Sequence, residues 1–219
     1  MRAALLPVLG ETRNQPAMFN QHLGRVESIC FALVPIGLAS GAAIVWILLP
    51  IGFPSEYFDG TLGASARDIF MLLLAGWAFT VLSVPSYTAL QAGERPWMFT
   101  FLIMTVVLSS TILGVILINL GAQTSIGRAI EMAAYASVAS SFVMLMLGIV
   151  LSRRFLNLKE RSLKWLATIC AVTVTCVALS QQSYWSLIGI GLFILLPQGL
   201  EATKTIVATP SSMTLAEEA

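Results

Sequence analysis

The chain has 219 residues, of which 57% are hydrophobic and only 11% are charged, and its mean hydropathy is +0.85. A soluble domain normally carries about 25% charged residues, so this composition leaves too few polar side chains to cover a globule in water. The net charge of +1 and the pI near 7.7 give no indication of a nucleic-acid partner. The composition therefore predicts an integral membrane protein.

The polar N-terminal stretch, residues 1–27, is predicted to be a cytoplasmic amphipathic linker. It is no secretory signal peptide, because the first long apolar run begins only near Ser28. Residues 28–205 are predicted to form the transmembrane bundle, and residues 206–219 a disordered cytoplasmic tail.

Six apolar runs approach the roughly 20 residues that a helix needs to cross the hydrocarbon core. All are predicted to be helices, since lipid offers backbone groups no other partner and the alternation of a barrel strand is absent. The fold class is therefore an all-α polytopic membrane bundle. The predicted spans are Ser28–Leu49, Ile69–Leu90, Pro96–Asn119, Ala129–Leu151, Leu163–Leu179 and Ser183–Thr203.

Basic residues predict the orientation of these spans, because lysine and arginine are retained on the cytoplasmic side. With the N-terminus inside, ten of the 12 basic residues lie in cytoplasmic segments, and only Arg67 and Arg128 lie outside. Six spans also return the C-terminus to the cytoplasm. We therefore expect a multi-pass protein of the bacterial cytoplasmic (inner) membrane with both termini cytoplasmic.

The segment "SVPSYTALQAGERPWMFTFL" (83–102) interrupts two strongly apolar runs. Gly93 can adopt the left-handed conformation that ends a helix, and Pro96 suits the first turn of the next helix. The segment is predicted to be the cytoplasmic turn of a helical hairpin.

Prolines inside the predicted spans remove backbone hydrogen bonds and bend helices. Pro35, Pro85 and Pro197 are the candidates for hinge or cavity-shaping positions. The simpler interpretation is that neighbouring helices merely tolerate such kinks.

Residues typical of catalysis and metal binding are sparse. His22 is the only histidine, and Cys30, Cys170 and Cys176 lie in apolar runs without the spacing of a metal site or a disulfide framework. No nucleophile elbow, phosphate-binding loop or metal-binding helix motif appears. The sequence predicts no enzyme activity, no catalytic residue, no metal and no cofactor.

The order of several elements resembles the polysaccharide flippases of the multidrug/oligosaccharidyl-lipid/polysaccharide (MOP) superfamily. "ALLPVLG" is followed by a polar linker and then by a helix with a central proline, "LVPIGL". "SYTALQAGERPW" and "INLGAQTSIGRAIEMAAYASVASSFV" continue the likeness across residues 3–155. The second of these departs from the usual small-residue helix entry at Arg128–Glu131. The resemblance implies the later part of a second lobe plus two extra helices, and hence a C-terminal fragment or a shortened reading frame.

This resemblance implies the flipping of an anionic lipid-linked oligosaccharide for polysaccharide or lipopolysaccharide export. Such a flippase is expected to offer cations along its cavity, and Arg67 and Arg128 are the candidates. Glu131 is included in this site because its i, i+3 spacing lets it pair with Arg128. The alternative is that these charges are solvated interfacial ion pairs.

Two other functions remain open. A cation-coupled multidrug exporter of the same superfamily generally needs carboxylates inside the membrane, and the six span interiors contain none. A non-transporting membrane scaffold is the second alternative. The expected partners are membrane lipids, an anionic lipid-linked glycan, and a missing N-terminal half or another membrane subunit.

Overall fold

A computed structural model describes residues 15–57, 65–92 and 97–156, and every regular element in these ranges is helical. The all-α prediction is therefore confirmed for this part of the chain. The elements are α2 (Pro16–Ala43), the π-helical η2 (Ile44–Leu48), α3 (Leu49–Gly52), the 3₁₀-helical η3 (Ser55–Tyr57), α4 (Ala66–Ala92), α5 (Trp97–Ala122) and α6 (Ile126–Leu156).

Three of these helices, α4, α5 and α6, are long and apolar enough to cross a membrane. They contain the second, third and fourth predicted spans, except for Pro96, which lies outside the described residues. Each helix also extends a few residues beyond its apolar run. The first predicted span is helical in α2 and η2 but is not one of these three. The fifth and sixth predicted spans lie outside the described residues, so a six-span bundle stays a prediction.

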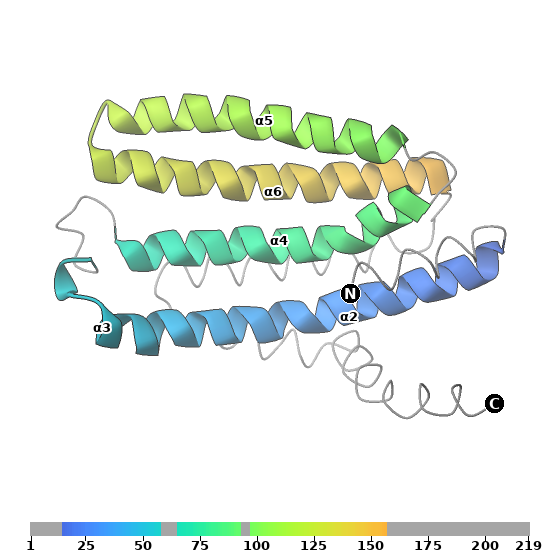
Figure 1. Ribbon diagram of the computed structural model, residues 1–219, viewed down its shortest axis with the longest axis horizontal. Coiled ribbons are helices and arrows are strands. Elements are labelled where there is room, and N and C mark those ends of the chain that lie inside the picture. The colour runs from blue at the N-terminus through green and yellow to red at the C-terminus, as the bar shows by residue number, and fades with distance from the viewer. Residues whose placement is uncertain (1–14, 58–64, 93–96, 157–219) are drawn as a thin grey trace.

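The four long helices lie side by side in one layer in the order α2, α4, α6, α5 (Figure 1). The sequence predicts that α4 and α5 form a hairpin, but α6 separates them along most of their length. They meet near their connection, where the Tyr87 and Phe99 rings form an edge-to-face pair with centroids 6.0 Å apart. Gly93 and Pro96 lie outside the described residues.

Helices α2 and α4 pack antiparallel through two glycines. The Trp77 ring lies over Gly37 and the Leu74 side chain over Gly41, so that a Cβ atom at either glycine would overlap the α4 side chain. Small residues four apart in this way let membrane helices approach closely. At the other end of the pair, Phe19 and Leu23 cluster with alanines of α4.

The predicted N-terminal linker is helical from Pro16 onward and continues into the apolar part of α2 without a break. Phe19, Leu23 and Val26 are buried, whereas Asn20 and Arg25 are exposed. This distribution makes the described half of the linker an amphipathic extension of the helix.

The wide turn of η2 ends two residues before Pro50. Proline cannot donate to the carbonyl four residues earlier, and its ring clashes with that carbonyl. A π-type turn avoids both problems by shifting the hydrogen-bond register, which accounts for the position of η2.

Helices α4 and α6 run parallel, and α5 runs antiparallel to both. Phe79 packs edge to face on Phe142 at 5.5 Å, and a Cβ atom at Gly148 would lie 3.2 Å from the Ser86 Cβ atom. The N-terminal ends of α4 and α6 therefore lie at one end of the layer, together with the C-terminal end of α5 (Figure 1). The N-terminal ends of α2 and α5 lie at the opposite end. Which of these ends faces the cytoplasm stays a prediction.

Candidate functional site

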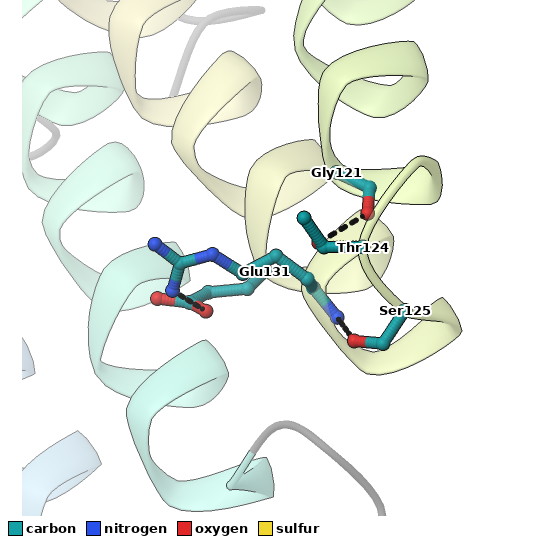
Figure 2. Close-up of polar contacts among 5 residues, drawn as sticks. Gly121, Thr124, Ser125 and Glu131 are labelled. Carbon is teal, nitrogen blue, oxygen red and sulfur yellow. Dashed lines mark hydrogen bonds and ion pairs between the residues drawn. The ribbon is translucent and has the colours of Figure 1, made fainter.

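The predicted pair of Arg128 and Glu131 lies in the first turns of α6. The Arg128 Nη1 atom is 2.6 Å from the Glu131 Oε2 atom, and the side chains are 50% and 21% exposed respectively. The i, i+3 spacing puts both residues on one face of the helix, and the structure contains the ion pair that this spacing predicts. Figure 2 shows Glu131 projecting from α6 on the side of α4.

The connection before α6 holds this pair in place through side-chain capping. The Ser125 hydroxyl accepts a hydrogen bond from the Arg128 backbone N–H at 3.1 Å, and the Thr124 hydroxyl donates to the Gly121 carbonyl at 2.7 Å (Figure 2). Ser125 thus satisfies one of the free N–H groups at the start of α6, as an N-cap serine does. Arg128 therefore extends from a fixed helix end rather than from a free loop.

Arg67 and Asp68 occupy the first turn of α4 at the same end of the layer. The Asp68 carboxyl is repelled by the negative charge of Glu131 and attracted by Arg67, so charges of α4 and α6 lie within electrostatic range of one another. Arg67 thus neighbours a carboxyl that lies within electrostatic range of Glu131. Arg67, Asp68, Arg128 and Glu131 are named here the charged cluster. Two arginines and two carboxylates make the formal charge of this cluster zero.

The three predicted hinge prolines have different outcomes. Pro85 is buried within α4, and α4 bends toward its C-terminal end in Figure 1. Its missing N–H leaves the Val81 carbonyl without the usual helical donor, which explains a bend at this place. Pro35 lies inside α2, and Pro197 lies outside the described residues.

A groove between α5 and α6 was not predicted. It encloses about 290 Å³ and is named here the serine groove. Its lining consists mainly of small and hydroxyl-bearing residues, namely Val106, Ser110, Gly114, Ile118, Ala133, Ala136, Ser137, Ser140, Ser141 and Met144. The signal for it is present in the sequence, because small residues recur at helical spacing from Ala133 to Ser141.

Two hydroxyl groups in or near this groove bond to carbonyls of their own helices. Ser140 donates to the Ala136 carbonyl at 2.7 Å, and Thr80 of α4 donates to the Gly76 carbonyl at 2.9 Å. Thr80 also lies 3.4 Å from the Ser141 hydroxyl, which links α4 to α6. These bonds satisfy hydroxyls in an apolar setting and explain how polar side chains are accommodated between the helices.

Groups suited to metal or acid–base chemistry are dispersed in the described part of the chain. No three histidine, cysteine, aspartate or glutamate residues lie close enough there to hold a metal ion. Cys30 is a buried free thiol in α2. His22 is half-buried in the same helix, one turn before Val26. The charged cluster and the serine groove are the two features of chemical interest.

Comparisons with known protein families, with curated proteins and with solved structures find no match to this chain. The resemblance to the MOP flippases therefore rests on the sequence elements described above.

Proposed function

We propose that this chain is a membrane transport component that moves an anionic lipid-linked oligosaccharide across the bacterial cytoplasmic membrane. The supporting observation is the cluster of Arg67, Asp68, Arg128 and Glu131, which two parallel helices contribute at one end of the layer. Arginine suits such a ligand because its planar guanidinium group can donate two parallel hydrogen bonds to a phosphate.

In this proposal the diphosphate competes with Glu131 for Arg128. The pair costs little to open, because the Arg128 side chain is half exposed and ion pairs in contact with water contribute only about 0–1 kcal/mol. A diphosphate carries more negative charge than one carboxylate, so it can displace Glu131 and then approach Arg67. Rocking of helix groups about the Pro85 bend would carry the bound lipid between the two sides of the membrane.

The proposal includes the predicted orientation, with both termini cytoplasmic and the charged cluster at the outer face. It also includes a further membrane subunit, or an N-terminal half of a longer protein, to complete the cavity. The helices of residues 15–156 that the structure describes form one layer, which by itself does not enclose a pathway for a glycan, and transporters of this kind place their substrate between two helix groups.

A second candidate is a scaffold that assembles with other membrane proteins and transports nothing. The open layer favours it, because α5 lies at an edge and most of its large apolar side chains are exposed. The cation-coupled exporter is less well supported, since no acidic residue lies within residues 70–90, 98–118 or 133–150.

The test is translocation of a fluorescent lipid-diphosphate-linked sugar in proteoliposomes containing the purified chain and its membrane partners. The double variant Arg67→Ala/Arg128→Ala should lose most of this activity. The matched control Arg154→Ala removes an exposed arginine at the opposite end of α6 and should retain activity. Wild-type translocation by the double variant would contradict the proposed site and favour the scaffold.

A further inference from the structure

Helices α2 and α4 remain in contact on both sides of the bend in α4. Before the bend, two α4 side chains lie over glycines of α2, namely Trp77 over Gly37 and Leu74 over Gly41. Beyond the bend, residues of both helices form a separate apolar cluster, namely Phe19, Leu23, Ala89 and Ala92. Helix α2 therefore follows α4 through its change of direction.

Each of the two helices has one proline in its interior, and each proline removes one helical hydrogen bond. Pro35 has no N–H to donate to the Phe31 carbonyl, and Pro85 has none to donate to the Val81 carbonyl. Helices bend sharply at such places, because the ladder of backbone hydrogen bonds is interrupted there. Phe31 and Val81 both pack against the same buried cluster of apolar side chains.

The register of the antiparallel pair places these two interruptions at one level. Gly37 of α2 lies against Trp77 of α4. Six residues farther from this contact along each helix, Phe31 lies opposite Ser83, which is two residues from Val81. The interruptions are therefore separated by less than one turn of about 3.6 residues.

Both helices turn to the same side beyond this level. The C-terminal end of α4 turns away from α2 and toward α6, and the N-terminal part of α2 inclines in the same direction (Figure 1). The end of α4 is held by α5 and α6, because Tyr87 contacts Phe99 and Gly148 lies against Ser86. Among the described helices, α2 packs mainly against α4. The direction of α2 therefore depends on that of α4.

A straight α2 would lose one of its two contacts with a bent α4. From Val81 to Ala92, α4 is about 16 Å long, and a kink of about 20° displaces its end by about 5 Å. Apolar side chains touch only when their heavy atoms approach within about 4.5 Å. A displacement of this size would separate Phe19 and Leu23 from the alanines of α4.

We propose that Pro35 and Pro85 form a paired hinge, at which α2 and α4 bend together. Residues 16–30, named here the α2 arm, move with the C-terminal end of α4 when the bend of α4 changes. A movement that begins where α4 meets α5 and α6 thus reaches α2, although α2 lies at the other edge of the layer. The inference concerns the mechanics of two packed helices and is independent of the proposed transport activity.

Pulsed electron resonance on the full chain tests the paired hinge. In a cysteine-free chain, spin labels at the exposed positions Gln21→Cys on the α2 arm and Thr100→Cys on α5 report the position of the arm across the layer. Pro85→Ala should lengthen this distance by about 5 Å, because a straightened α4 pushes the arm outward. Pro35→Ala should lengthen it by a similar amount, because a straight α2 carries the arm to the same place.

The double variant Pro35→Ala/Pro85→Ala distinguishes a paired hinge from two independent bends. Its distance should not exceed that of either single variant, since both helices are then straight and packed again. The matched control is Pro54→Ala, which changes an exposed proline outside the helices and should leave the distance unchanged. An unchanged distance in either single variant, or a change in the double variant equal to the sum of the two, would overturn the proposal.

The distances are measured without substrate, so loss or retention of lipid translocation does not affect the outcome. Only variants that elute from size-exclusion chromatography like the unsubstituted chain are compared. If Pro35→Ala does not meet this criterion, Pro35→Ser takes its place, because serine also restores the backbone N–H.

Discussion

Gly121 of α5 lies against Ala129 of α6 so closely that a Cβ atom on Gly121 would be 2.8 Å from the Ala129 Cα atom and 2.7 Å from the Arg128 carbonyl oxygen. Both of these are backbone atoms, which cannot move aside as a flexible side chain can. The close approach fixes the ends of α5 and α6 against each other. It also fixes the backbone position from which the Arg128 side chain extends.

Gly121→Ala is therefore expected to destabilise the protein. Forcing a methyl group into a packed contact typically costs about 1–3 kcal/mol, and here only backbone movement can relieve it. Thermal unfolding in detergent should show a lower midpoint. Gly52→Ala is the control, because nothing lies within 4 Å of the added Cβ atom there, and its midpoint should stay close to that of the unsubstituted chain. Equal midpoints for the two variants would contradict the close contact.

Arg128→Gln and Glu131→Gln break the same ion pair but should differ in function. Each change should alter stability by less than about 1 kcal/mol, because the Arg128 side chain is half exposed and water screens the pair. If Arg128 binds the diphosphate, Arg128→Gln should abolish lipid translocation. Glu131→Gln removes the competing carboxylate and should preserve translocation. Equal losses of translocation in both variants would mean that the pair acts only structurally.

Pro85→Ala should straighten α4, because alanine restores a donor for the Val81 carbonyl. Spin labels at Phe70→Cys and Gln91→Cys, placed in a cysteine-free chain, report the length of the helix by pulsed electron resonance. We expect the distance between the labels to increase by a few ångströms relative to the same chain with Pro85, approaching about 32 Å between the backbones at 1.5 Å per residue. An unchanged distance would assign the bend in Figure 1 to a cause other than this proline.

The orientation can be tested at two exposed residues near opposite ends of the layer. Ser55 in η3 follows the C-terminal end of α2 and η2, and Arg154 lies near the end of α6. In a cysteine-free chain, Ser55→Cys should react with a membrane-impermeant thiol reagent on intact cells, and Arg154→Cys should react only after the cells are opened. The reverse pattern would invert the topology and move the charged cluster to the cytoplasmic face.

The positions of the helices along the chain could be predicted, because apolar runs and charged ends are local properties. Ile69–Leu90 and Ala129–Leu151 fall within α4 and α6, and these helices extend farther because backbone hydrogen bonds continue past the apolar run. The Arg128–Glu131 ion pair could also be predicted, because its i, i+3 spacing is a local property. The electrostatic interaction of Glu131 with Asp68 depends on which helices are neighbours, and the sequence does not specify this.

The lateral order of the helices could not be predicted because helices such as α4 and α5 are apolar on all sides. Hydropathy then does not distinguish a face that meets lipid from a face that meets protein. The choice of neighbouring helix depends instead on the shapes of the two helix surfaces. The Trp77 ring of α4, for example, lies over Gly37 of α2, and this contact depends on both helices at once. The separation of α4 from α5 by α6 depends on such contacts, as at Gly148, where an added Cβ atom would lie 3.2 Å from the Ser86 Cβ atom.

The place of α6 between two neighbours, and of α5 at the margin, has a consequence for sequence variation. Bulky substitutions along the outward side of α5, at Val115 or Ile116 for example, meet no protein atoms within the described chain and should be well tolerated. Equivalent changes at Leu145 or Gly148 of α6 must displace a neighbouring helix. A saturation-mutagenesis profile of this protein should therefore be permissive on α5 and restrictive on α6, although α5 is the more apolar of the two helices.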